Sequence, residues 1–296
     1  MTYYPAAISD DQNTIPLMPS WVAPRRAKTP EDVAFLSGAA LSYLHVVLGQ
    51  GDIPHALLRS RLALRAADAC VAFSGRPERA GELRDAVQFL QPGDQPGPAG
   101  EVYLQWRRAV ERPVSVGALN RALPGMDPEA IATWLDAGQG APVARAASVL
   151  ETVLSQISRG DVAALILADA ALAQGLGWDH VVPLLASGLK RRDLRKTGED
   201  LRLTCHQAVV ASATETVRQA ADLARRAARL KAAAPKLRAK GAGEAVDMFL
   251  ARDAVAPSTL TSLSSDRAAR RFCDRLVELG AVRELTGRDT FRLYGI

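Results

Sequence analysis

The stretch from residue 199 to 234 reads EDLRLTCHQAVVASATETVRQAADLARRAARLKAAA and contains neither glycine nor proline. Alanine, leucine, arginine and other good helix formers dominate it. Pro235 follows directly, and a proline ends or kinks a helix because it lacks an N–H group and clashes with the preceding turn. The stretch therefore predicts one long helix that ends close to residue 234.

Helical patterns continue outward from this stretch in both directions. Thr29, Pro30, Glu31 and Asp32 are typical of a helix start, with a hydroxyl cap, a proline in the first position and acids in the first turn. We find almost no strand pattern before residue 280, which predicts an all-α body. Between proline and glycine breaks, the predicted helices cover about residues 30–48, 54–74, 78–90, 101–110, 113–125, 128–138, 142–158, 162–174 and 180–189.

Composition sets the class of protein. The chain has 296 residues, of which 48% are hydrophobic, 23% charged and 5% aromatic. These values are typical of a globular chain with a buried core, and they exclude a mainly disordered or collagen-like protein. An alanine-rich, aromatic-poor chain also favours helices over sheets.

The spacing of the cysteines and the hydropathy of the chain indicate the cellular compartment of the protein. Cys70, Cys205 and Cys273 lie far apart and form no CxxC motif, so we expect neither a zinc site nor a disulfide framework. The first residues lack the basic and apolar regions of a secretory signal. The most apolar stretch, residues 162–178, is interrupted by Asp169 and Gln174, which favours a buried helix over a membrane span. We expect a cytoplasmic protein without membrane contact.

The last 56 residues differ in character from the rest. Helical patterns at 244–250, 257–263 and 266–279 are followed by two short extended segments, 282–285 and 290–294, around a turn at 286–289. Three helices and a two-stranded hairpin are the order of a winged helix-turn-helix module. We therefore divide the chain into an extended N-terminal arm (1–28), an all-helical domain (29–240) and a winged-helix module (241–296).

Positive charge is concentrated in one part of the chain. The net charge is +5, yet residues 190–240 hold 14 Lys/Arg and five Asp/Glu, whereas residues 241–296 hold eight of each. One cluster lies at 190–196 and a second at 225–240. A basic surface beside the terminal module would attract phosphates, although a solvated basic face is the commoner outcome.

The helix at 266–279 is the strongest functional candidate. Apolar residues fall on one face, and Arg267, Arg270 and Arg271 fall on the other, as expected of a recognition helix. Arg288 and Arg292 in the hairpin would reach an adjacent groove. The predicted nucleic-acid-binding residues are thus Arg267, Arg270, Arg271, Arg288 and Arg292. The alternative is a solvated face in a module that binds only protein, which the zero net charge of residues 241–296 favours.

A second set of charges lies within the helical body. Arg61, Arg65 and Asp68 follow one face of a predicted helix, and Arg84 is close in sequence. A buried charge without a partner is costly, so these residues form either a structural ion-pair network or an anion or ligand pocket.

The sequence contains no catalytic, metal or cofactor motif that we can defend. Its four histidines form no ligand pattern, and Walker and GxSxG motifs are absent. We expect a non-catalytic, DNA-associated or regulatory protein that binds double-stranded DNA and needs no cofactor or metal. The alternatives are an enzyme or small-ligand binder with a pocket in the helical body, and an interaction scaffold that forms a homodimer through the winged helix.

Several segments resemble a bacterial family known as domain of unknown function DUF1403. They are FLSGAAL at 35–41, RLALRAA at 61–67, LRDA at 83–86, PGDQPGPAG at 92–100 and Trp106-Arg107. The tail, RELTGRDTFRLYGI at 283–296, is similar to the C-terminal DNA-binding-like module of related bacterial helical proteins. The family resemblance implies no activity, because none is established for DUF1403.

Overall fold

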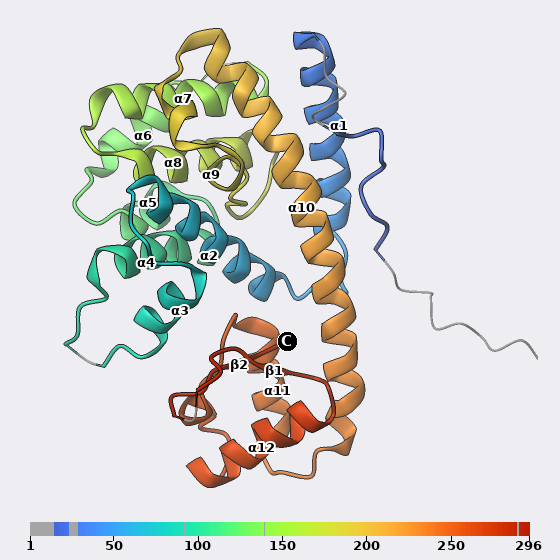
Figure 1. The fold of residues 1–296 in the computed structure, drawn as a ribbon. Coiled ribbons are helices and arrows are strands. Elements are labelled where there is room, and N and C mark those ends of the chain that lie inside the picture. Colours follow the sequence, from blue (N-terminus) through green and yellow to red (C-terminus); the bar gives the residue numbers. More distant parts are fainter. Residues whose placement is uncertain (1–14, 24–28, 92, 139, 289) are drawn as a thin grey trace, which may run out of the picture.

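The computed structural model describes residues 15–23, 29–91, 93–138, 140–288 and 290–296 (Figure 1). It confirms the all-α prediction, since helices make up the body and the described strands form one antiparallel pair. The longer helices are α1 (Pro30–Leu48), α2 (His55–Phe73), α3 (Ala80–Gln88), α4 (Gly97–Glu111), α5 (Val116–Ala122), α6 (Pro128–Asp136), α7 (Pro142–Gln156), α8 (Asp161–Gly175), α10 (Gly198–Ala233), α11 (Ala242–Ala251) and α12 (Asp266–Glu278). A single turn, α9, spans Leu185–Gly188, and the strands are β1 (Arg283–Glu284) and β2 (Tyr294–Gly295).

The 36-residue helix α10 runs along one side of the molecule, from α7 and α9 at one end past α1 and α2 to α11 of the C-terminal segment at the other (Figure 1). At 1.5 Å per residue it is about 54 Å long. Helix α1 lies alongside it, and the two pack through α1 residues such as Leu36, Leu44 and Val47. The predicted cap is present, since the Thr29 hydroxyl accepts from the Asp32 amide at 3.1 Å and the Asp32 carboxylate accepts from the Thr29 amide at 3.0 Å.

Helix α1 is also long and apolar enough to cross a membrane, judged by length and composition alone. The core helix of a globular protein meets the same criterion, and α1 buries one face against α10. The more apolar helix α8 is buried all round from Ala163 to Ala173, which confirms the prediction of a buried helix.

The body contains a second pair of helices, α2 and α4, which carry the pocket described below. Trp106 on α4 is fully buried, and its indole N–H points to the Cys70 sulfur on α2 at 3.4 Å. Burial raises the pKa of the Cys70 thiol to about 12, so the thiol stays protonated at neutral pH. The two helices therefore form a rigid, apolar support.

Some predicted boundaries are wrong. The helix predicted at 101–110 starts earlier than expected, because α4 begins at Gly97 with Pro98 in its first turn, a position that tolerates proline. The predicted helix at 180–189 shrinks to α9, and the predicted helix at 257–263 becomes a 3₁₀ turn at Pro257–Thr259. Most of the predicted extended arm, residues 1–14 and 24–28, lies outside the described residues, as does Asp289 of the predicted turn.

The shrinkage at 180–189 has a physical reason in a buried carboxylate. Asp169 on α8 is fully buried, and it accepts the backbone N–H groups of Leu184, Leu185 and Ala186 at 2.8–3.2 Å. These groups are the free donors at the start of a helical turn. The carboxylate therefore fixes the first turn at Leu185, and the chain before it is not helical.

The C-terminal segment forms a compact unit at one end of the molecule, below α2 and α3 in Figure 1. It consists of α11, the 3₁₀ turn, α12 and the β1–β2 pair, in which Arg283 faces Gly295 and Glu284 faces Tyr294. Val255 adds an extended segment beside β2 through two backbone hydrogen bonds with Tyr294, at 2.8 and 2.9 Å. We call residues 242–296 the C-terminal module.

Candidate functional site

Helix α12 has one buried face and one exposed face. Ser265 caps its start by accepting the Ala268 amide at 3.3 Å. Ala269, Phe272, Cys273 and Leu276 are buried against the rest of the C-terminal module. This apolar face fixes the orientation of the helix.

The arginines at the start of α12 lie on the opposite, exposed face. Arg267, Arg270 and Arg271 are exposed, and none of them forms a hydrogen bond or salt bridge with any residue that the structure describes. Arg275, one turn further on, pairs with Glu278 at 2.8 Å. Helix α12 also forms an outer edge of the molecule (Figure 1). The first two turns of α12 therefore present three cations that an external anion can reach.

The two hairpin arginines lie elsewhere: Arg288 contacts the body, and Arg292 contacts other residues of the hairpin. Arg288 forms a salt bridge with Asp85 of α3 at 2.6 Å, and its guanidinium stacks over the Phe89 ring at 5.5 Å. Phe291 packs edge-on against the same ring at 5.5 Å. Arg292 donates to the Arg288 carbonyl at 3.0 Å. Of the five predicted DNA contacts, the structure thus groups three on α12, places Arg288 at the contact between hairpin and body, and places Arg292 within the hairpin, 3.8 Å from Glu284.

A buried charge cluster joins the C-terminal module to the body. Asp253, which is only 1% exposed, lies between Arg61 of α2 and Arg84 of α3, and the Arg84 Nε reaches its carboxylate at 2.5 Å. Arg61 also donates to the Ile296 carbonyl at 3.0 Å. Gly295 allows this approach, because a Cβ there would lie 2.7 Å from the Asp253 carbonyl oxygen. We call Arg61, Arg84 and Asp253 the clamp.

The clamp contains only part of the charge set predicted from the sequence. Arg61 and Arg84 meet through Asp253, which no sequence pattern had indicated. Arg65 and Asp68 lie on the same helix as Arg61 but outside the clamp, and neither forms a salt bridge with another described residue. Burial lowers the pKa of the Arg61 guanidinium, while the neighbouring Asp253 raises it.

The basic stretch divides into two clusters at opposite ends of α10. Lys190 to Lys196 precede its first turn, whereas Arg225, Arg226 and Arg229 lie in its last turns. The second cluster faces Arg283 of β1 across a hollow of about 190 Å³, in which Asp222 pairs with Arg225 and Arg226. Only this second cluster lies beside the C-terminal module.

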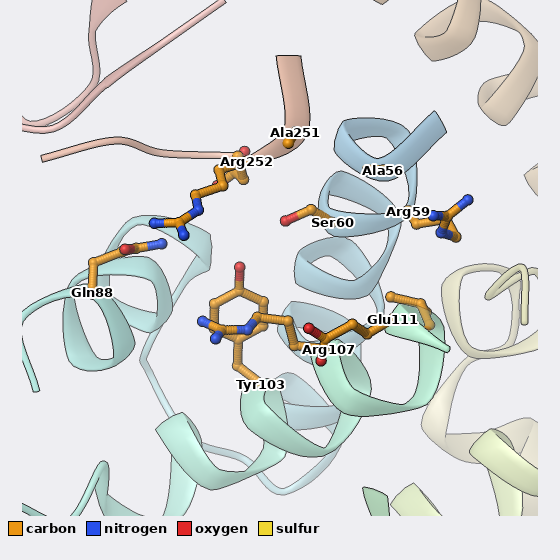
Figure 2. Close-up of a pocket in the computed structure, with 11 residues that line it drawn as sticks. Ala56, Arg59, Ser60, Gln88, Tyr103, Arg107, Glu111, Ala251 and Arg252 are labelled. Carbon is orange, nitrogen blue, oxygen red and sulfur yellow. The ribbon is translucent and has the colours of Figure 1, made fainter. Parts of the chain in front are cut away.

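A larger pocket of about 390 Å³ lies between the body and the C-terminal module. We call it the seam pocket. Figure 2 shows the guanidinium groups of Arg107 and Arg252, the hydroxyls of Tyr103 and Ser60 and the amide of Gln88 facing a common space, with Arg59 directed away from them. Burial raises the pKa of Tyr103 to about 12, so its hydroxyl is a hydrogen-bond donor at neutral pH. The remaining lining residues are Ala56, Val110, Glu111, Ala251 and Asp253.

Three histidines line another hollow of about 410 Å³: His45, His55 and His180. The Trp178 indole donates to the His45 Nδ1 at 2.9 Å, and burial lowers the pKa of His180. Among the described residues, no three His, Cys, Asp or Glu side chains are grouped so that they could hold a metal ion. The grouping of His45, His55 and His180 was not apparent from the sequence, because His180 lies more than 100 residues after the other two.

Comparison with known proteins identifies the family of the chain, and the description of that family assigns it no function. No curated protein matches the sequence. Residues 6–296 match the family described as protein of unknown function (DUF1403), which covers nearly the whole chain, including the C-terminal module. The predicted resemblance to DUF1403 is confirmed, and the chain belongs to the DUF1403 family.

Proposed function

We propose that the protein is a non-catalytic, DNA-associated regulator that holds duplex DNA on the exposed face of α12. In this proposal the C-terminal module is a winged-helix variant with α12 as its recognition helix. The observation that carries the proposal is the arginine set of Arg267, Arg270 and Arg271, which is exposed and without an acidic partner among the described residues. Arginine forks suit both phosphates and guanine edges.

Neighbouring charge supports the same surface. The end of α12 leads through Gly280 to Arg283, which shares its hollow with Arg225, Arg226 and Arg229 of α10. Helix α12 has 13 residues and is therefore about 20 Å long, so these cations lie within reach of one duplex. They offset the zero net charge of residues 241–296, since phosphate neutralisation supplies most non-specific affinity.

Arg288 and Arg292 have a different role in this proposal. Arg288 braces the module against α3 through Asp85 and Phe89, and Arg292 donates to the Arg288 carbonyl within the hairpin. The hairpin then acts as a support that points α12 outward. DNA contact is assigned to α12 and the end of α10.

Replacing Arg270 and Arg271 together by alanine tests the proposal. We expect duplex affinity to fall by more than about tenfold at low salt, because each lost charge-assisted contact contributes about 1–3 kcal/mol. The matched control is the double variant Arg112→Ala and Arg121→Ala, which removes two exposed arginines from the body. Fluorescence anisotropy with a labelled duplex measures both.

Equal affinities of the two double variants would show that α12 is not the DNA surface. The scaffold alternative would be favoured by two results together. The wild-type chain would bind no duplex and elute as a dimer, and light scattering would show that removal of Arg270 and Arg271 breaks that dimer.

A further inference from the structure

We infer that the seam pocket is a binding site for a small metabolite that carries an oxyanion, a phosphate ester or a carboxylate. This site is separate from the proposed DNA surface, and its existence does not depend on DNA binding. Its volume of about 390 Å³ falls within the range of small-molecule sites, which is roughly 300–1,000 Å³.

The pocket is rich in hydrogen-bond donors, and its two inward-facing arginines have no partner among the described residues. Arg107 and Arg252 are exposed, and their side chains form no salt bridge or hydrogen bond with a described residue. The Tyr103 hydroxyl, on the same helix as Arg107 and hydrogen-bonded to Ser60, and the Gln88 amide of α3 face the same space (Figure 2). Two guanidinium forks with hydroxyl and amide donors are the chemistry that recognises a phosphate or carboxylate group.

The acidic residues of the pocket leave this preference intact. Asp253 contributes no free negative charge, because Arg61 and Arg84 both contact its carboxylate. Glu111, at the end of α4, is the remaining acid in the lining, and the two guanidinium groups of Arg107 and Arg252 outweigh its charge. A carboxylate at the edge of a cationic pocket accepts hydrogen bonds from hydroxyl groups. The site therefore fits a hydroxylated oxyanion such as a sugar phosphate.

The two guanidinium groups come from different parts of the chain. Arg107 belongs to α4 of the body, and Arg252 follows α11 of the C-terminal module. An oxyanion held by both binds only while the module is docked on the body. By linkage, a ligand that binds only this arrangement stabilises it. Occupancy of the seam pocket is therefore expected to raise the melting temperature of the full chain.

Calorimetric titration of the full chain with ribose 5-phosphate, succinate and ribose tests this inference. We expect ribose 5-phosphate to bind the wild-type chain, and Arg107→Ala and Arg252→Ala each to lower that affinity by about tenfold or more. Arg112→Ala, which removes an exposed arginine just outside the pocket, should bind like the wild type. Ribose lacks the anion and should not bind.

Succinate binding in place of ribose 5-phosphate, with the same loss in both variants, would support the site and identify the carboxylate as its group. The inference is overturned if neither acid binds the wild-type chain, or if both pocket variants bind as tightly as Arg112→Ala. Melting curves of each variant without ligand verify that the fold is retained, which the exposure of both arginines leads us to expect.

Discussion

Replacing Asp253 by alanine is expected to lower the free energy of unfolding by about 3–5 kcal/mol. The substitution leaves Arg61 and Arg84 facing each other in a largely buried position, where their side chains are 13% and 14% exposed. Removing one partner of a buried ion pair is costly because the remaining charges have lost their compensation. The cost falls on the contact between module and body, so the module should also become more accessible to protease. Urea unfolding followed by circular dichroism, with limited proteolysis, measures both effects.

Asp85→Ala is the matched control for that change. It also removes an aspartate that pairs an arginine across the same contact, but Arg288 and Asp85 are 44% and 31% exposed. Exposed pairs contribute at most about 1 kcal/mol, because water and salt screen them. A loss of stability in Asp253→Ala that is no larger than in Asp85→Ala would show that the clamp does not hold the module.

The second large effect concerns Asp169 and depends on pH. Burial raises the pKa of Asp169 to about 7, against an ordinary value of 3.8, although three backbone N–H groups oppose this rise. Between those two values the folded chain keeps a proton that the unfolded chain has released. Stability is therefore fully present below about pH 4 and falls as the pH rises through about 7, by roughly 4 kcal/mol in total.

Asp169→Asn isolates this contribution, since asparagine does not titrate. We expect the stability of the wild type relative to Asp169→Asn to decrease steadily from about pH 5 to pH 7, measured by urea unfolding at each pH. Histidines that titrate in the same range affect both chains alike. A relative stability that does not change between pH 5 and pH 7 would mean that the three N–H groups hold Asp169 ionised in the folded protein.

The sequence predicted much of the helical architecture because helix signals are local. Thr29 and Pro30 mark the start of α1, and the run without glycine or proline marks α10. The helix boundaries that were predicted wrongly depend on residues outside the helix itself. The helix predicted at 180–189 is shortened by Asp169, whose side chain reaches the chain 15–17 residues further on. Within the sequence, Asp169 was visible only as a break in an apolar stretch.

The residues that form the candidate sites lie even farther apart in the sequence. The arginine stripe of α2 was visible, but Asp253 is 192 residues away from Arg61, so no local pattern joins them. Arg288 looked free at a hairpin tip, yet Asp85 lies opposite it, 203 residues away in sequence. The face of α12 could be predicted because its apolar and basic positions follow one helical period. The seam pocket could not be predicted, because the hydrogen-bond donors that line it come from several parts of the chain.

The salt dependence of duplex binding by the wild-type full chain tests the central claim most directly. If Arg267, Arg270 and Arg271 each neutralise a phosphate, a plot of log affinity against log salt concentration has a slope of about −3, and steeper if Arg229 and Arg283 take part. We predict that slope, flattened in the chain that lacks Arg270 and Arg271. Duplex binding that does not change with salt, or no binding at low salt, would contradict the assignment of α12 as a DNA-binding surface.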